Sequence, residues 1–181
     1  MSAIVDAVRS ALGEAVLGAD AGFGSTTLDV APARWADAAR AARDAGATYF
    51  DMLAAYDLEA DGFAVVAHLS RPDAADHLLL RTRVDRDAPQ VPTLVEVYAG
   101  AAWHEREAHE MLGVSFAGHE PLAPLLLDPS APATPLRKDV LLVARPSTPW
   151  PGDKDPADST GRPRRRTPPP GVPADRPREG A

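Results

Sequence analysis

The chain has 181 residues, a formal net charge of −7 and no cysteine. This length is enough for one hydrophobic core, and the lack of thiols excludes disulfides and sulfur ligands for zinc or an iron–sulfur cluster. The negative charge argues against nucleic acid as the main partner, and no apolar run reaches the roughly 18 residues that span a membrane.

The N-terminal segment is predicted to fold as a helix, a loop and a short strand. Residues 3–17 repeat apolar side chains on one face of a helix that is expected to end near Gly18. The Gly-rich residues 19–26 are expected to form a loop. They contain neither a Walker lysine nor a full Gly-x-Gly-x-x-Gly motif, which argues against a phosphate-binding role. A brief strand is predicted at residues 27–30.

The next segment is predicted to contain a second helix and then three strands. Pro32 suits a helix start, the alanine-rich residues 33–45 favour helix, and Gly46 suits the C-terminal cap. The third strand alternates apolar residues with Leu79, Arg81 and Arg83, so one of its faces is expected to meet solvent or a partner. The predicted strands are residues 48–56, 62–70 and 77–84.

The C-terminal part is predicted to be a helix at 93–112, a Pro-rich connection at 119–135 and an edge strand at 140–144. The predicted fold class is therefore α/β (α+β), with a mixed sheet of about four strands packed with helices in residues 1–152. The Pro/Arg-rich residues 153–181 are expected to be disordered, because they cannot bury enough apolar surface to offset their ordering entropy.

The predicted helix 93–112 is unusual on both of its faces. At 100° per residue, Glu105 lies in the middle of the apolar stripe, whereas Trp103 and Glu107 lie on the opposite side. Two interpretations remain open. Either both faces are covered, which requires a neighbour beyond the chain's own sheet, or Gly100 breaks the helix and Trp103 belongs to the chain's own core.

A metal-dependent enzyme that uses His104, Glu105 and His109 is a competing hypothesis. The spacing His-Glu-x-x-x-His has one residue more than the zinc-protease motif, so the two histidines point about 140° apart around a helix. No Gly-x-Ser-x-Gly elbow is present. His68, within a predicted strand, is expected to be a structural histidine and not a base.

Two sequence blocks carry a family resemblance: W-H-E-R-E-A-H-E-M-L-G-V-S-F-A-G-H at 103–119 and P-L-R-K-D at 135–139. They resemble the signature of the 30 kDa, or C, subunit of proton-pumping NADH:quinone oxidoreductase (respiratory complex I). The likeness extends over roughly residues 28–152. In the first block, the matching positions are Trp103, Glu105, Arg106, Glu107, Met111, Gly113, Phe116, Gly118 and His119.

The resemblance implies an accessory subunit in the peripheral arm of a translocase that couples electron transfer from NADH to quinone with proton transport. Members of this family bind no cofactor and pack against the subunit that forms the quinone cavity. The resemblance therefore implies no catalytic residue, metal site or cofactor site in this chain. It places the chain at the cytoplasmic face of the cell membrane, as a peripheral subunit.

The resemblance also implies a partner-docking surface. We expect Arg106 to stay within the chain and pair with an acid, and Arg137 to reach a carboxylate or carbonyl of the partner. The residues assigned to docking are Trp103, Glu105, Arg106, Glu107, His119, Arg137, Lys138 and Asp139.

Departures from the family pattern leave further functions open. His109-Glu110 stands where the family carries an aromatic-Asp pair, and two family arginines are absent after His119. These departures fit an equivalent subunit of a paralogous quinone-reducing complex, or of a membrane-bound hydrogenase, with another electron donor. A stand-alone adaptor that kept the fold is the remaining alternative.

Overall fold

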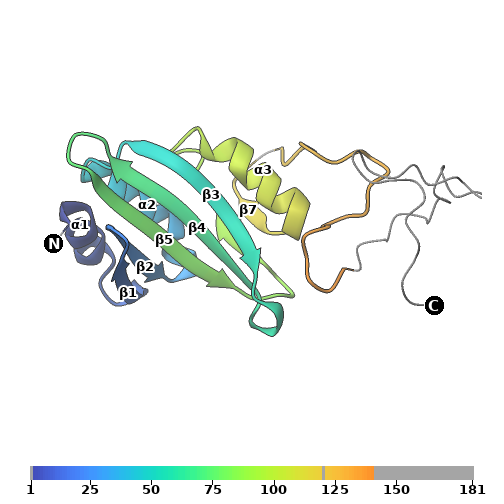
Figure 1. Ribbon diagram of the computed structural model, residues 1–181, viewed down its shortest axis with the longest axis horizontal. Coiled ribbons are helices and arrows are strands. Elements are labelled where there is room, and N and C mark those ends of the chain that lie inside the picture. The colour runs from blue at the N-terminus through green and yellow to red at the C-terminus, as the bar shows by residue number, and fades with distance from the viewer. Residues whose placement is uncertain (1, 120, 141–181) are drawn as a thin grey trace, which may run out of the picture. The chain divides into compact units, whose positions relative to one another are not determined.

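The computed structural model describes residues 2–119 and 121–140 (Figure 1). Five strands form one mixed sheet in the order β1-β2-β5-β4-β3. Neighbouring strands are antiparallel except for β2 and β5, which are parallel. The α+β class is confirmed, with one strand more than expected. The strands are β1 Val16–Gly22, β2 Ser25–Val30, β3 Tyr49–Asp57, β4 Phe63–Arg71 and β5 Asp76–Val84.

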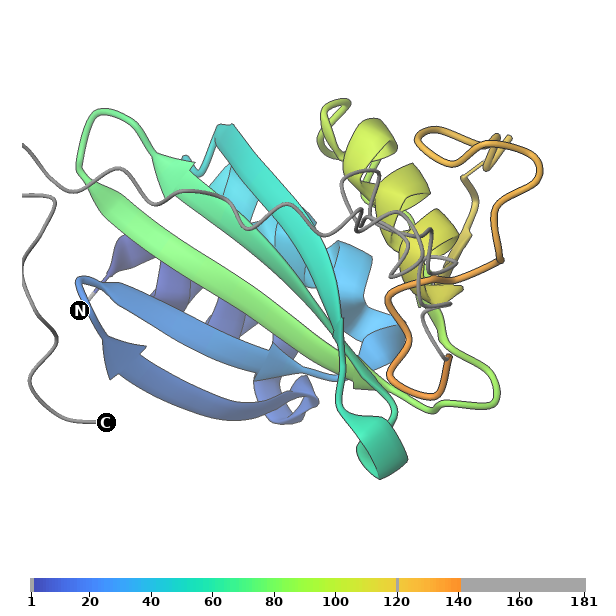
Figure 2. The same cartoon turned by 45° about the vertical axis from the view of Figure 1, so that its right-hand side comes forward.

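Two helices, α1 (Ala3–Leu12) and α2 (Trp35–Asp44), cover one face of this sheet (Figures 1 and 2). The face of α2 toward the sheet is mainly alanine, and Ala38, Ala39 and Ala42 are fully buried. Small side chains let the helix lie close to the strands, where Leu78 and Leu80 of β5 are also buried. The core therefore lies between these helices and the sheet.

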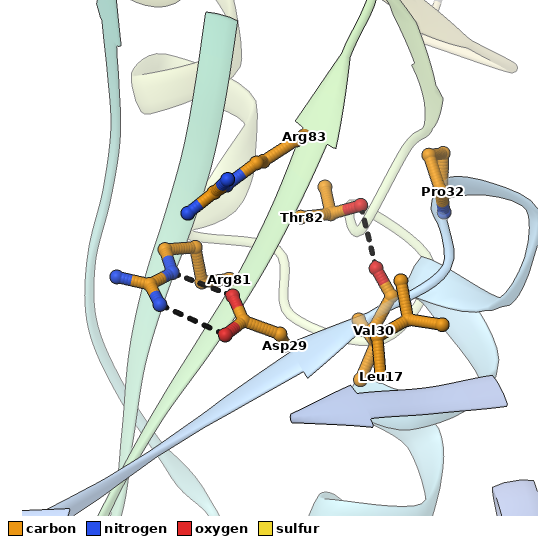
Figure 3. A pocket seen from close by; sticks show the side chains of 7 residues that line it. All are labelled: Leu17, Asp29, Val30, Pro32, Arg81, Thr82 and Arg83. Atoms are coloured by element: carbon orange, nitrogen blue, oxygen red, sulfur yellow. Dashed lines mark hydrogen bonds and ion pairs between the residues drawn. The ribbon is translucent and has the colours of Figure 1, made fainter. Parts of the chain in front are cut away.

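The other face of the sheet carries the alternate residues of each strand. On β5, Arg81 donates two hydrogen bonds to Asp29 of β2, with Nε–Oδ1 and Nη2–Oδ2 distances of 2.6 and 2.8 Å (Figure 3). This bidentate pair crosses the parallel contact between the two strands. Arg83, two residues further along β5, is exposed.

The N-terminal helix is shorter than predicted. It ends at Leu12, and Gly13 has a φ of 52°, a conformation that glycine adopts without strain. A 3₁₀ turn (Gly13–Ala15) leads into β1, which pairs with β2 through the two-residue turn Phe23-Gly24. The expected loop at 19–26 is therefore wrong, because this segment is mostly a hairpin.

The second helix confirms the predicted start and cap. Pro32 begins a 3₁₀ turn (Pro32–Arg34) that continues into α2. At the other end, the N–H of Gly46 bonds to Arg43 O, and the N–H of Ala47 bonds to Ala42 O. This is a Schellman cap in which Gly46 takes a φ of 103°.

The third helix, α3, spans Ala101–Leu112 and packs along β3. It begins eight residues later than predicted, because residues 93–100 form turns and the N–H of Leu94 bonds to a side chain. Gly100 is the N-cap, and Gly113 ends the helix with a φ of 79°. Two short parallel strands flank α3 in sequence, β6 (Gln90–Pro92) and β7 (Ser115–Ala117).

Two predictions fall largely outside the described residues: the edge strand at 140–144, of which 141–144 are not described, and the disordered tail at 153–181. The domain boundary after residue 152 stays a prediction for the same reason. Within the described ranges, no helix is both long enough and apolar enough to cross a bilayer.

Candidate functional site

The centre of α3 is fixed by a buried carboxylate. Glu105 is fully buried and accepts hydrogen bonds from the N–H of Leu94 (2.7 Å) and the hydroxyl of Thr93 (2.6 Å). His119 Nδ1 lies 2.8 Å from the same carboxylate. Glu105 therefore joins α3 to the residues that follow β6 and to those that follow β7. The chain thus buries Glu105 within its own fold.

A second face of α3 holds the strap, which we define as residues 121–140. Arg106 donates to the carbonyl oxygens of Ala123 (2.9 Å) and Pro124 (2.6 Å). Arg106 thus stays within the chain as expected, but it bonds to carbonyls and not to the expected acid. One turn further along, Glu110 accepts from three consecutive backbone N–H groups, those of Leu125, Leu126 and Leu127.

These bonds make Glu110 a stable anion. Burial raises the pKa of the Glu110 carboxyl, but the three backbone N–H bonds and the nearby Arg106 outweigh it. The pKa is therefore held below its ordinary value. Sequence reasoning treated Glu110 only as a departure from the family pattern. Its role depends on a strap segment 15–17 residues away, which no local pattern indicates.

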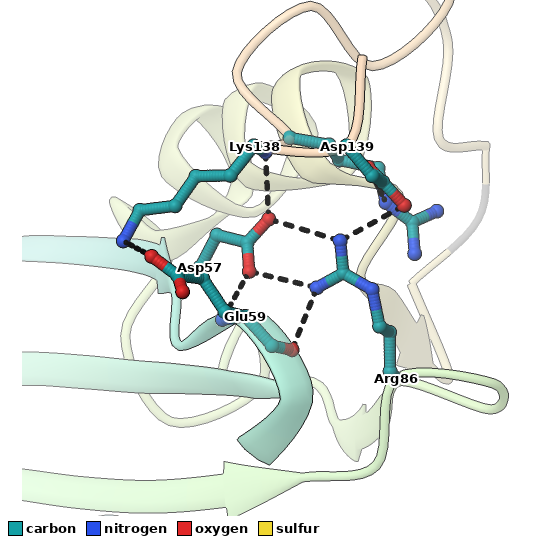
Figure 4. A network of polar contacts seen from close by, with 6 residues as sticks. Asp57, Glu59, Arg86, Lys138 and Asp139 are labelled. Atoms are coloured by element: carbon teal, nitrogen blue, oxygen red, sulfur yellow. Dashed lines mark hydrogen bonds and ion pairs between the residues drawn. The ribbon is translucent and has the colours of Figure 1, made fainter.

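The end of the strap is fixed at the end of β3 (Figure 4). The Asp57 carboxylate accepts from Arg86 Nη1 (2.7 Å) and from the backbone N–H of Lys138 (2.8 Å) and Glu59 (2.7 Å). Lys138 Nζ bonds to Glu59, and Arg86 Nη2 lies 2.9 Å from Asp139. Hydrogen bonds from Arg86, against the opposing effect of burial, hold the pKa of Asp57 well below its ordinary value. The block 135–139 therefore closes a contact within the chain.

Arg137 is directed inward as well. Its guanidinium lies 5.0 Å from the centre of the Phe63 ring, and its Nε is 3.7 Å from Asp139 Oδ1. That separation suits an ion pair but is too long for a hydrogen bond. The buried Nε therefore has no hydrogen-bond partner among the described residues. Arg137 thus has contacts within the chain, and its assignment to docking stays a prediction.

Exposed apolar side chains surround α3 and the strap. Trp103 is 64% exposed, and the Arg106 guanidinium lies 5.4 Å from the centre of its ring. Trp103 is therefore not part of the core, contrary to one of the two interpretations. Leu126 and Leu136, both on the strap, are each 61% exposed, and Glu107 is exposed on α3. We call these five residues, Trp103, Arg106, Glu107, Leu126 and Leu136, the α3 patch.

The structure separates the three side chains of the metal-enzyme hypothesis. His104 Nδ1 lies 3.1 Å from the carbonyl oxygen of Leu53, and His109 Nδ1 lies 2.9 Å from that of Val114. Glu105 is engaged in the buried network described above. Among the residues that the structure describes, no three His, Cys, Asp or Glu side chains form a metal-holding group.

His68 lies on the sheet face opposite α1 and α2. Its Nδ1 is 2.8 Å from Asp51 Oδ2, and its Nε2 is 3.2 Å from Nδ1 of His77, whose ring stacks on it. Both of its ring nitrogens therefore have partners, as expected for a structural histidine.

Of the predicted docking residues, the structure brings Trp103, Arg106 and Glu107 together on α3 and takes Glu105 and His119 into the interior. Lys138 and Asp139 join the network around Asp57. No observation tests whether any of them meets a partner, so their assignment to docking stays a prediction.

Comparison with known proteins identifies the family. Residues 28–146 match the family described as Respiratory-chain NADH dehydrogenase, 30 Kd subunit. The C subunit of NADH-quinone oxidoreductase from Roseiflexus sp. (strain RS-1) is 35% identical over 146 residues, which cover 78% of this chain and 84% of that protein. The corresponding protein of Azoarcus sp. (strain BH72) is 36% identical, and the match covers 73% and 72% of the two chains.

Two solved structures have the same fold. A chain of the membrane-bound sulfane sulfur reductase, an archaeal respiratory membrane complex, aligns with a TM-score of 0.67 at 24% identity, over 77% of this chain and 85% of that one. The trypsin-resistant fragment of Nqo5 aligns with a TM-score of 0.57 at 19% identity, over 65% and 97% of the two chains. The sequence matches, supported by this shared fold, show that the chain belongs to the 30 kDa subunit family of respiratory-chain NADH dehydrogenase.

Proposed function

We propose that the chain is a non-redox subunit in the peripheral arm of an NADH:quinone oxidoreductase, at the cytoplasmic face of the membrane. The relatives named as the C subunit of NADH-quinone oxidoreductase support this assignment. The sequence offers no thiolate for an iron–sulfur cluster, which supports a role without electron transfer of its own. Flavin or iron–sulfur absorption in the purified chain would contradict that role.

The proposed contact with the complex is the α3 patch, and its partner is the subunit that forms the quinone cavity. The observation that carries this proposal is the exposed Trp103 with Arg106 over its ring. Tryptophan and arginine are enriched among the few residues that dominate binding energy, and a tryptophan buries about 150–250 Å² at a contact. An exposed pair of this kind on a well-held helix is suited to an interface.

The contacts inside the chain support the same proposal. Glu105 fixes one side of α3, and the strap, bonded to Arg106 and Glu110, fixes another. The patch is therefore already ordered before it meets a partner. Binding then loses little conformational entropy, which favours affinity.

Co-purification of a Trp103→Ala variant tests the proposal. We expect the variant to melt like the unchanged chain, because this side chain is mostly outside the core, but to lose about 2 kcal/mol or more of binding to the complex. Phe23→Ala is the matched control, since Phe23 is an exposed aromatic residue on the β1–β2 turn, away from α3.

If the Trp103→Ala variant assembles normally, the α3 patch is not the contact with the complex. Recovery of the unchanged chain without any other subunit would instead favour a stand-alone adaptor.

A further inference from the structure

Almost every cation in the described part of the chain has a polar partner within the chain. The exceptions are Arg9 and Arg83, for which the described residues provide neither a hydrogen-bond nor an ion-pair partner. Arg9 lies on the outer side of α1, whereas Arg83 lies on β5 and lines a hollow. Arg83 is thus exposed without an ion-pair partner among the described residues, in a chain whose net charge is −7.

The hollow beside Arg83 has a volume of about 270 Å³ and lies where β1, β2 and β5 approach Pro32. Arg81 and Arg83, two residues apart on β5, point to the same side, with Leu17 and Pro32 on the other side of the view (Figure 3). Leu17 is 69% exposed. The hollow thus combines a guanidinium group with an apolar rim.

The charges around the hollow leave Arg83 as the group that can take an anion. Asp29 is bonded at both oxygens by Arg81, which is the main reason that its pKa is lowered. That pair is internally neutralised, and the Thr82 hydroxyl is already bonded to Val30 O. A net charge of +1 remains at Arg83, whose guanidinium has the fork geometry that suits a carboxylate.

The charge and the apolar rim of the hollow favour a protein side chain as its occupant. Its volume lies near the lower end of the roughly 300–1,000 Å³ of typical small-molecule pockets. A single free guanidinium is far from the basic patch that nucleic acid or an anionic membrane requires. An exposed leucine beside an arginine instead suits a segment of another protein in which an aliphatic side chain lies next to an acidic one.

We propose that this hollow is a second docking site, which receives an Asp or Glu side chain of another subunit at Arg83 and an adjacent apolar side chain at Leu17. The inference rests on the proposed function, because the partner is a subunit of the same complex. It concerns a different surface, since β4 lies between β5 and the edge strand β3, along which α3 packs.

Zero-length cross-linking of the assembled complex tests the inference. A carbodiimide joins an amine to a carboxylate in direct contact, so Arg83→Lys is expected to give a new link between position 83 and an acidic residue of another subunit. Arg9→Lys is the matched control, because it adds an amine at the other arginine without a partner. No such link is expected there.

The charge reversal Arg83→Glu gives a second measurement. It is expected to weaken retention of the chain in the complex about tenfold or more, whereas Arg9→Glu leaves retention unchanged. Melting of both variants checks that the fold is kept.

The outcomes separate the two proposals. If the chain assembles but position 83 links only to its own Asp29, or if Arg83→Glu assembles normally, the second docking site is wrong and the α3 patch is unaffected. If the unchanged chain joins no complex, both proposals are wrong.

Discussion

The described structure has two parts, the sheet with α1 and α2, and helix α3 with the strap. The two parts differ in how far they rely on ionised groups. Helices α1 and α2 cover the sheet through apolar side chains, and the largest buried residues there are Trp35, Phe63 and Ile4. Helix α3 also buries apolar side chains such as Ala108 and Leu112, but three carboxylates fix its surroundings: Glu105 bonds to Leu94, Glu110 bonds to the strap, and Asp57 bonds to the end of the strap.

This difference has a physical consequence. Apolar burial depends on the area removed from water and is insensitive to pH, whereas a buried carboxylate stabilises the fold only while it is ionised and fully bonded. The α3–strap region therefore depends on a few ionised groups in addition to its apolar contacts, whereas the sheet core depends mainly on apolar contacts. The region that presents the α3 patch is ordered while these carboxylates are ionised, and it is more sensitive to acid than the sheet core.

Removal of the Glu105 carboxylate gives the largest expected effect. Glu105→Ala leaves the N–H of Leu94, the hydroxyl of Thr93 and the ring of His119 without their buried acceptor. We expect the free energy of unfolding to fall by about 3–5 kcal/mol, measured by chemical denaturation. Glu107→Ala, on the exposed side of the same helix, should stay within about 0.5 kcal/mol. Equal effects of the two variants would contradict the comparison.

A cavity in the sheet core is expected to have the next largest effect. Leu80 is fully buried in β5, and Leu80→Ala should lower the free energy of unfolding by about 2–5 kcal/mol. Because no charge is involved, the loss should be the same at pH 7 and pH 5 in denaturant titrations. If the decrease in unfolding free energy differs between these two pH values, ionisable groups contribute to the stability of this core.

Acid is expected to release the strap before it unfolds the sheet. The pKa values of Asp57 and Glu110 are lowered in the folded chain, so their stabilisation is complete above the unfolded values of about 4. It is lost as the pH falls from about 4 toward the lowered folded values. Hydrogen exchange at pH 3 should therefore reveal faster exchange in residues 121–140 than in β4 and β5.

Asp57→Asn is the control for the acid prediction. At pH 7 this variant should lower the free energy of opening of the strap, measured by hydrogen exchange, by about 1–3 kcal/mol. The additional decrease on acidification should then be smaller than in the unchanged chain. Loss of protection in β4 and β5 at the same pH as in the strap would show that the two parts unfold together.

Strong local patterns made most of the fold predictable from sequence. The alternation in residues 77–84 and the alanine content of residues 33–45 predicted β5 and α2 correctly. Strand β1 was missed because V-L-G-A-D-A-G has small residues and no clear alternation. The start of α3 was placed too early because Leu94 continues the helical period, although its N–H bonds to Glu105.

The candidate site was less predictable than the fold. The motif residues Trp103, Arg106 and Glu107 were found, but the roles of Asp57 and Arg86 were not, because the two lie 29 positions apart and form no local pattern. Arg137 was expected to face a partner, yet Phe63 and Asp139 lie within its reach in this chain. Long-range polar contacts of this kind depend on the folded geometry.

Photo-cross-linking from position 103 tests the central claim most directly. A photoreactive phenylalanine analogue is placed at Trp103, and at Phe23 as the control, and each variant is irradiated in the purified complex. The account predicts a covalent link from position 103 to another subunit, and none from position 23. A complex that contains the chain but gives links from position 103 only to the chain itself would contradict the docking role of α3.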